Sequence, residues 1–160
     1  MGVNQRAQIV LTDDELESLL AGSRSMTMAT IGADGQPHLV AMWFALIDGD
    51  ICFETKAKSQ KAVNLRRDPR ITCLVEAGTE FAEFRAVELR GRGEVSGDVE
   101  TSRRTGLALY ERAAGVLTDD MRGAVDAMAA DRVAVTVVPD RTVSWDHRKL
   151  PGARPADVGR

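Results

Sequence analysis

The feature that most constrains the fold is a series of short apolar segments, each closed by tight-turn residues. MTMATI (26–31) is followed by Asp34-Gly35, and the next run, HLVAMWFALI (38–47), ends at Asp48-Gly49-Asp50 before ICFET (51–55). Asp-Gly pairs supply the positive φ angles that two-residue hairpin turns need. Turns this short join antiparallel neighbours, because a parallel pair needs a long crossover. The first half of the chain is therefore predicted to form a β-meander.

The second half adds further strand-like runs, and one of them contains two glycines. Because Gly91 and Gly93 fall inside a strand pattern, they predict a bulge or bend and not a dinucleotide-binding loop. The predicted strands of this half are ITCLVE (71–76), FAEFRAVELRGRGEV (81–95) and VAVTVVP (133–139), with TVSWDHRKL (142–150) as a last short extended piece.

Capping residues predict four short helices. Thr12 and Glu15 form a capping box, and Ser59 precedes a helical run that must stop before Pro69. Asp98 and Thr118 occupy equivalent N-cap positions further on. The predicted helices span 12–22, 60–67, 100–114 and 119–130. With six or seven mostly antiparallel strands, they indicate a mainly β (α+β) fold, a small barrel with helices at its ends.

Length and composition indicate a single domain over residues 1–150, followed by a loose tail at 151–160. No apolar run is long enough for a membrane helix, and the N-terminus lacks the apolar core of a signal peptide. Cys52 and Cys73 lie in apolar runs and are expected to be buried thiols. With no paired Cys or His motif, no metal site is expected. These features predict a cytoplasmic protein.

Positive charge is concentrated in one short segment of an acidic chain. The net charge is −3, whereas residues 54–70 alone carry six Lys or Arg against Glu54 and Asp68, a balance of +4 that leaves −7 elsewhere. The overall charge argues against nucleic acid or a membrane surface as a partner. A compact basic segment on an acidic body favours a small anionic ligand.

The basic segment lies where a predicted strand gives way to a predicted helix. A helix start offers unpaired N–H groups and the positive end of the helix dipole. Thr55 and Ser59 add hydroxyls, while Lys56, Lys58 and Lys61 add charge. The junction is therefore interpreted as a phosphate or carboxylate site. The alternative is a solvated helix with surface lysines.

The sequence contains no catalytic constellation of its own. His38 is interpreted as a polar residue at a strand start, and no Ser-His-Asp or paired-carboxylate pattern appears. If the protein is an enzyme, a cofactor is expected to carry the chemistry. One face of the strand around Trp43 is expected in the core and the other against a planar ligand. Trp145, among charged neighbours, is interpreted either as a lid on a partner subunit's site or as part of an exposed end strand.

Four segments together resemble a known family. DGQPHLVAMWF, DGDICFET, KAKSQKAVNLRRDPRITCLVE and VELRGRGEV are similar to the pyridoxamine-phosphate-oxidase-like flavin-binding split β-barrels, and more closely to the branch that uses the deazaflavin coenzyme F420. The resemblance covers roughly residues 12–145. It implies a homodimer of split barrels in which each cofactor site lies in a groove between the subunits.

The resemblance also implies the residues of the cofactor site. The ring would lie along one strand and the phosphate at the strand-to-helix junction, where Lys61 is the phosphate contact. Lys56 and Lys58 could pair with the carboxylates of the F420 tail. The implied cofactor-binding residues are Val40, Ala41, Met42, Trp43, Phe44, Ala45, Thr55, Lys56, Lys58, Ser59, Lys61, Asn64 and, from the partner, Trp145.

Two departures from the family pattern favour F420 over FMN. Gln60 stands between Ser59 and Lys61 where the oxidases carry arginine, and Ala45 replaces a basic residue. The resemblance thus implies an F420H2-dependent reductase that transfers a hydride to a planar conjugated acceptor such as an enone, a quinone or a tetrapyrrole. The alternatives are an FMN-dependent oxidoreductase of the same fold and a non-catalytic carrier of a cofactor or haem.

Overall fold

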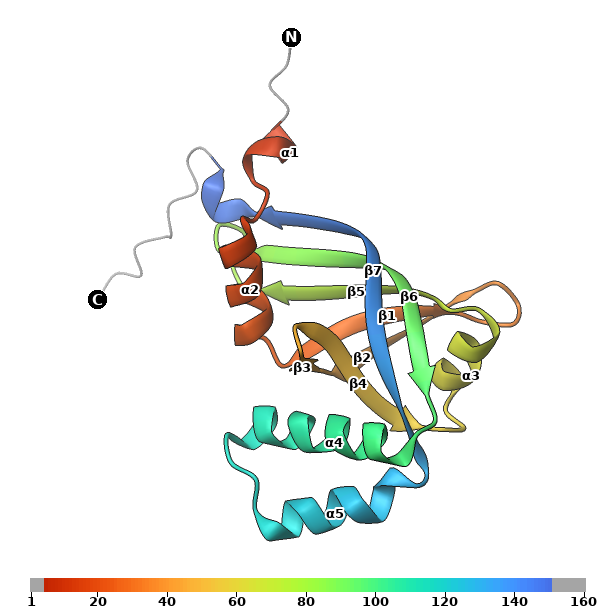
Figure 1. The fold of residues 1–160 in the computed structure, drawn as a ribbon. Coiled ribbons are helices and arrows are strands. Elements are labelled where there is room, and N and C mark those ends of the chain that lie inside the picture. The colour runs from red at the N-terminus through yellow and green to blue at the C-terminus, as the bar shows by residue number, and fades with distance from the viewer. Residues whose placement is uncertain (1–4, 151–160) are drawn as a thin grey trace.

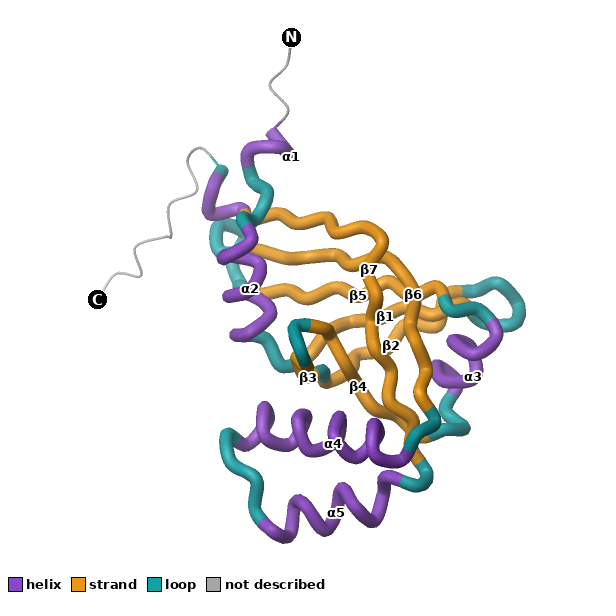
Figure 2. The backbone as a smooth tube through the Cα atoms, in the orientation of Figure 1, coloured by secondary structure: helices purple, strands orange, loops and turns teal. Residues whose placement is uncertain are grey.

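Seven antiparallel strands form one curled sheet in the computed structural model, which describes residues 5–150 (Figures 1 and 2). Their order across the sheet is β2-β1-β5-β6-β7-β4-β3. The strands are β1 Ser25–Ile31, β2 Pro37–Trp43, β3 Ala45–Ile47, β4 Asp50–Lys56, β5 Arg70–Ala77, β6 Arg85–Ser96 and β7 Arg132–Asp146. The helices are α1 Gln5–Gln8, α2 Asp13–Gly22, α3 Gln60–Arg67, α4 Val99–Ala114 and α5 Asp119–Ala129, with a 3₁₀ turn at His147–Lys149. The mainly β fold with short helices is confirmed.

A bend at Phe44 closes the sheet on itself. β2 and β3 stand at opposite ends of the strand order, yet only Phe44 separates them in the chain. Its N–H donates to the carbonyl of Arg24 (3.2 Å), outside the strand ladder. The prediction of one continuous strand over 38–47 was therefore wrong. Because the bend brings the two ends of the sheet together, the strands curl into the split β-barrel that the resemblance implies.

Residues that begin or break strands behave largely as their types predict. Asp48 and Gly49 both adopt positive φ (55° and 92°) between β3 and β4, as a tight hairpin turn requires. The register of β6 against β7 shifts between Arg90 and Gly91, which confirms the bulge. A side chain at position 91 would place its Cβ 2.1 Å from the carbonyl oxygen of Val138, so only glycine fits there.

Two predicted strand boundaries were wrong, and both errors arise from context beyond the local pattern. β7 is one strand over 132–146 and not two segments, because the bulge opposite Gly91 absorbs the polar interruption near Asp140 without ending the strand. β6 begins at Arg85, and the preceding residues from Gly78, whose φ is 95°, form a turn. The predicted tail at 151–160 lies outside the described residues.

The core fills the inside of the curled sheet. Side chains alternate in β1, where Met26, Met28 and Thr30 are buried and their neighbours half-buried. The hydrophobic core cluster consists of Leu11, Leu19, Met26, Met28, Phe44, Ile51, Phe53, Leu65, Ile71, Cys73, Val75, Val87, Leu89, Val135 and Val137. Both thiols are buried as predicted, and burial raises the pKa of Cys52 and, to about 12, that of Cys73. Neither is therefore a ready nucleophile.

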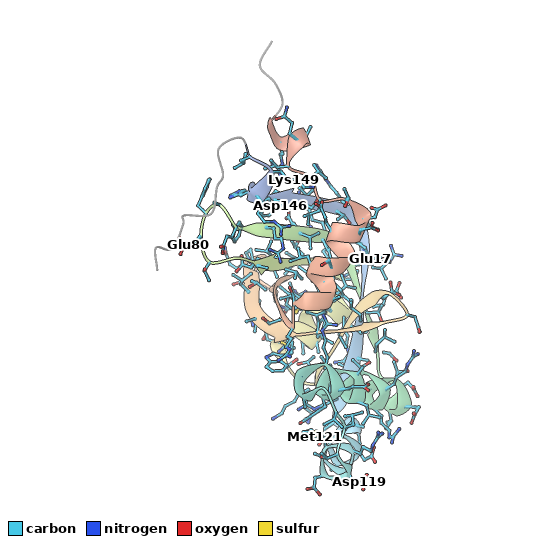
Figure 3. The ribbon with its side chains drawn as sticks, turned by 90° about the vertical axis from the view of Figure 1, so that its left-hand side faces the viewer. Glu17, Glu80, Asp119, Met121, Asp146 and Lys149 are labelled. Carbon is cyan, nitrogen blue, oxygen red and sulfur yellow. The ribbon has the colours of Figure 1, made fainter. Side chains whose placement is uncertain are left out.

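The predicted helix caps are all formed. The Thr12 and Ser59 side chains accept N–H groups at the starts of α2 and α3, and Asp98 and Thr118 do so for α4 and α5. In Figure 1, α2 lies across one end of the sheet and the α4–α5 hairpin lies beside β3 and β4. Figure 3 shows Asp119 and Met121 of that hairpin at the end of the molecule opposite Lys149. No helix among the described residues is both long and apolar enough to span a membrane.

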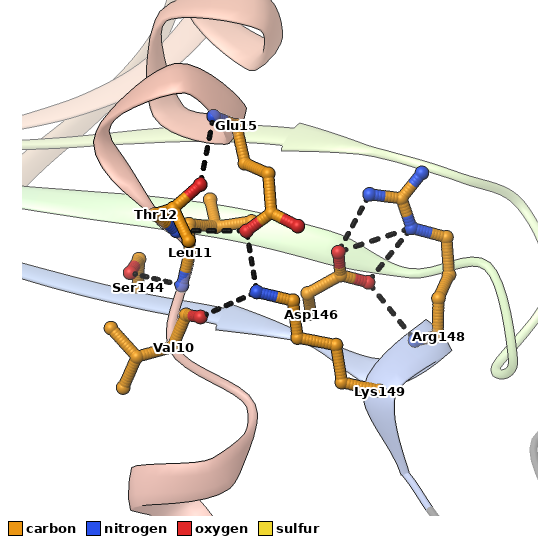
Figure 4. Close-up of polar contacts among 8 residues, drawn as sticks. All are labelled: Val10, Leu11, Thr12, Glu15, Ser144, Asp146, Arg148 and Lys149. Atoms are coloured by element: carbon orange, nitrogen blue, oxygen red, sulfur yellow. Dashed lines mark hydrogen bonds and ion pairs between the residues drawn. The ribbon is translucent and has the colours of Figure 1, made fainter.

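Polar contacts tie the N-terminal segment to the end of β7 (Figure 4). Asp146, 1% exposed, accepts three hydrogen bonds from the Arg148 guanidinium (Nε 2.9 and 3.1 Å, Nη2 2.6 Å). Burial alone would raise the pKa of Asp146, but these bonds outweigh it and the pKa is lowered. Lys149 pairs with Glu15 and holds the pKa of that carboxyl below its usual value. A further link is the bond from the Leu11 N–H to Ser144 Oγ (3.1 Å).

Candidate functional site

The predicted anion site lies where β4 ends and α3 begins. Ser59 Oγ lies 3.1 Å from Thr55 Oγ1 and also accepts the Ala62 N–H (3.4 Å). The two hydroxyls that the sequence singled out are therefore adjacent and held in place. Because the first N–H groups of a helix have no partner within it, those of Gln60 and Lys61 remain available to a ligand. The junction has the geometry of an anion cradle.

The lysines of this junction have no carboxylate partner among the described residues. Lys61 is half-buried, and burial lowers its pKa. A bound anion would offset that cost by restoring a counter-charge. Lys56 and Lys58 are exposed and line a pocket of about 490 Å³ together with Ala57 and residues 130–131. This part of the segment is basic and hollowed, and the Asp131 carboxylate that also lines the pocket forms no ion pair with either lysine.

The Asn64 side chain links α3 to β1 through contacts within the protein. Its side chain is fully buried, its Nδ2 donates to Thr30 Oγ1 (3.0 Å), and its Oδ1 accepts from Gln60 Nε2 (2.8 Å). Both ends of the amide are thus occupied by protein. These bonds anchor the first turn of α3 to β1, and a role of Asn64 in cofactor binding stays a prediction.

A second pocket, of about 480 Å³, lies between the β1–β2 turn and the start of α3. His38 lines it, and the pairing of His38 with Thr30 places the two side chains on one face of the sheet. His38 Nδ1 is buried with no hydrogen-bond partner among the described residues. Sequence reasoning took His38 for a strand-end residue, although its strand period, shared with Val40 and Met42, places it on the inward face. The other residues of this pocket are Gly32, Ala33, Asp34, Gln36, Pro37, Gln60 and Asn64.

The predicted ring-binding strand divides its side chains between two faces. Val40 and Met42 pack against the core, and Phe44 and Ala45 are each 1% exposed, so these four face inward. Only Ala41 and Trp43 of the predicted six point outward, and Trp43 is 55% exposed. For Phe44 and Ala45, only backbone atoms remain available to a ligand.

The outward side chains belong to a surface that is uncharged on β1 and β2, whereas the same side of β5 and β6 carries Glu76, Glu88 and Arg90. Strand register aligns β2 with β1 and β1 with β5, and residues that face each other in these pairs share a side of the sheet. We call this surface the outer face. Its residues are Ser25, Thr27, Ala29, Leu39, Ala41, Trp43, Thr72 and Leu74. Leu39 is 66% exposed, so the surface is apolar at its edge.

Trp145 lies far from the anion cradle within one subunit. Lys56 pairs with Arg132 at the start of β7, and Trp145 stands 13 residues further along that strand, opposite Ala86. The register places Trp145 on the same side of the sheet as Trp43, with β6, β5 and β1 between their strands. Four strand spacings separate the two strands, about 19 Å along the sheet.

These features define a split β-barrel with a candidate anion cradle at the start of α3 and exposed apolar side chains on the outer face of β2. The family model for pyridoxamine 5'-phosphate oxidase matches residues 12–146. The chain therefore belongs to the pyridoxamine 5'-phosphate oxidase family.

Individual relatives agree with the family assignment. A solved structure of a conserved hypothetical protein from Mycobacterium tuberculosis is 50% identical, with a TM-score of 0.86 over 93% of this chain and 94% of that one. A solved F420 reductase is 32% identical, with a TM-score of 0.63 over 79% of this chain and 94% of that one. A pyridoxine/pyridoxamine 5'-phosphate oxidase of Cupriavidus metallidurans is 34% identical over 55% of this chain, a match that spans only 38% of the relative's length. None of these similarities identifies contact residues, so the cofactor-binding set stays a prediction.

Proposed function

We propose that the protein is an F420-dependent oxidoreductase that reduces a planar conjugated acceptor, such as an enone, a quinone or a tetrapyrrole. The observation that carries the proposal is the half-buried Lys61 on the first turn of α3, which forms no ion pair among the described residues, in a fold whose strand β2 exposes Leu39 and Trp43. A cofactor with a phosphate arm and a planar ring suits this arrangement, because the phosphate could pair with Lys61 and the ring could lie against β2. When bound, the reduced deazaflavin supplies the hydride.

The residues present fit such a cofactor. Lys61 and the free N–H groups at the start of α3 would hold the phosphate, and His38 has an unpartnered nitrogen on the adjoining pocket. Lys56 and Lys58, which line the neighbouring pocket, suit the carboxylates of the F420 tail. The outer face of β2 would support the ring and exclude water from one side of it. By holding donor and acceptor together, such a site can contribute several kcal/mol to catalysis.

Gln60 favours F420 over FMN. Its amide N–H is engaged with Asn64 (2.8 Å), so it serves the anchoring of α3 and adds no charge to the cradle. Lys61 is then the one cationic side chain in the first turn of the helix. A single cation suits a phosphodiester, which carries less charge than the terminal phosphate of FMN. The 32% identity to an F420 reductase supports the same choice.

We further propose that the active form is a homodimer with the cofactor between subunits. Leu39 and Trp43 present large apolar side chains to water on the outer face, and burying each is worth about 1.5–3 kcal/mol. A second copy is the occupant that the split-barrel resemblance implies. Trp145 lies too far from the cradle of its own subunit to contact a ring bound there. In a dimer, Trp145 of the partner could approach that ring instead.

Binding titrations test the cofactor proposal. Purified protein is titrated with F420 and with FMN, and ligand fluorescence is followed. We expect Lys61→Ala to weaken F420 binding at least ~10-fold, about 1.4 kcal/mol for one charge-assisted contact. Arg122→Ala on α5 removes the same charge from an exposed position and should leave the affinity unchanged. Micromolar binding of FMN without binding of F420 contradicts the cofactor choice.

The two alternatives give different results in the same experiments. An FMN-dependent oxidoreductase, which the family match equally allows, would purify yellow and bind FMN more tightly than F420. A non-catalytic carrier would bind its cofactor and show no turnover with quinones, enones or tetrapyrroles.

A further inference from the structure

Arg112, near the end of α4, is a half-buried cation whose contacts are all with neutral groups. Its guanidinium donates to the carbonyl oxygens of Leu20, Ala21 (3.2 Å) and Ser23 (Nε, 3.1 Å). Its Cζ lies 4.9 Å from the centroid of the Phe44 ring. Burial, and secondarily the charge of Arg24, lowers the pKa of Arg112. No ion pair involves this residue among the described residues.

These contacts meet at the bend that separates β2 from β3. Hydrogen bonds from two residues hold the chain between α2 and β1. The carbonyl of Ser23 accepts from Arg112, and the carbonyl of Arg24 accepts from the N–H of Phe44 (3.2 Å). Arg112 also covers the Phe44 ring, so one guanidinium fixes both the connector and the bend. The residue before the bend is Trp43, whose side chain points outward.

We propose that Arg112 is a positioning residue for the ring-binding face. It fixes Phe44 and the end of α2 against α4, and thereby sets the direction in which Trp43 and Ala41 present the outer face of β2. This inference rests on the proposed function for its ligand and on the contacts above for its geometry. Arginine suits the task because its planar fork can reach several carbonyls while it lies over an aromatic ring. A lysine has one compact ammonium and cannot make both kinds of contact.

The first test needs no cofactor. The chain has two tryptophans, so Trp145→Phe leaves Trp43 as the only one. In that background we expect Arg112→Met to lower the fluorescence anisotropy of Trp43 and to increase its quenching by acrylamide about twofold. Arg104→Met is the matched control, since Arg104 lies on the same helix and pairs with the exposed carboxylate of Asp48 (2.9 Å). It should change neither signal. Measurements are made well below each variant's melting temperature, so that loss of stability is not mistaken for loss of position.

The second test measures the ligand consequence by F420 titration. We expect Arg112→Met to bind F420 about 10-fold more weakly, a loss of about 1.4 kcal/mol, and Arg104→Met to bind as the wild type does. Arg112→Lys keeps the charge but should bind F420 as weakly as Arg112→Met does. If Arg112→Met fails to fold, Arg112→Lys takes its place in both tests.

The outcomes separate this inference from the proposed function. An unchanged Trp43 signal in Arg112→Met overturns the inference whether or not F420 binds. A changed Trp43 signal with unchanged F420 affinity overturns the role in ring binding. If the wild type binds neither F420 nor FMN, the proposed function fails, and the Trp43 signal alone upholds or overturns the role of Arg112 in fixing the bend.

Discussion

Asn64 offers the sharpest test of how the cradle is built. Asn64→Ala removes an amide that joins Gln60 on α3 to Thr30 on β1 through bonds of 2.8 and 3.0 Å. Each such bond contributes about 1 kcal/mol net, and leaving a buried hydroxyl without its partner costs ~1–3 kcal/mol. Thr30 is fully buried, so the full penalty applies there. We expect a loss of about 2–4 kcal/mol in the free energy of unfolding.

The assay is urea unfolding combined with a double-mutant cycle. A loss of about 3 kcal/mol lowers the melting temperature of a chain this long by ~6–12 °C. Thr30→Val removes the hydroxyl at nearly constant shape, and the cycle with Asn64→Ala should give a coupling energy near 1 kcal/mol. Val63→Ala, at the exposed neighbouring position of α3, should change stability by less than ~0.5 kcal/mol. Additivity of Asn64→Ala and Thr30→Val would refute the reasoning, because the two groups would then not interact.

Two further predictions concern stability at other places in the sheet. Burial raises the pKa of Glu54, and Arg132, 3.3 Å away, only partly opposes this. The folded state therefore binds more protons, and this contribution to stability is present below the ordinary value of 4.5 and is lost as pH rises through the raised pKa. Glu54→Gln should flatten that part of the pH profile, measured by urea unfolding between pH 4 and 8; an unchanged slope contradicts it. Gly91→Ala should cost ~4 kcal/mol or more, since its Cβ would meet the backbone of Val138, whereas Gly97→Ala, with open space around it, should be nearly neutral in thermal melts. Equal melting temperatures for the two glycine variants would exclude that clash.

Local signals predicted the elements that a few neighbouring residues determine. The caps at Thr12, Ser59, Asp98 and Thr118 form because a side-chain oxygen reaches an N–H two or three residues away. The Asp48-Gly49 turn forms for an equally local reason. The predicted position of the anion cradle rests on the same kind of signal, and the structure does place a capped helix directly after a strand there.

What the sequence could not predict depends on contacts between distant parts of the chain. The bend at Phe44 is fixed by Arg24 and Arg112, and the bond from Arg112 to Ser23 spans 89 residues. The spacing of apolar residues within 38–47 gives no information about these distant contacts. The sequence therefore predicted one continuous strand there. Asn64 was included among the cofactor-binding residues through the family resemblance, and only the structure reveals that its side chain also anchors α3 to Thr30. The inward position of His38 could have been predicted from the strand period that it shares with Val40 and Met42, but its buried, unpartnered Nδ1 depends on the packing around it.

Self-association and ring binding are proposed to use the same outer face, and this makes them measurably linked. If a second copy covered all of that face, no room would remain for a ring, so the ring must lie at the margin of the interface, near Trp43. A ligand held by both subunits binds the dimer better than the monomer and so favours association through mass action. We expect sedimentation velocity to show a dimer whose dissociation constant falls at least ~10-fold at F420 concentrations well above its Kd. Trp43→Ser should weaken both dimerisation and F420 binding, because it removes the side chain that the two surfaces share. If Trp43→Ser stays dimeric and loses only F420 affinity, the ring-binding surface and the dimer interface are different, and the interface does not include Trp43.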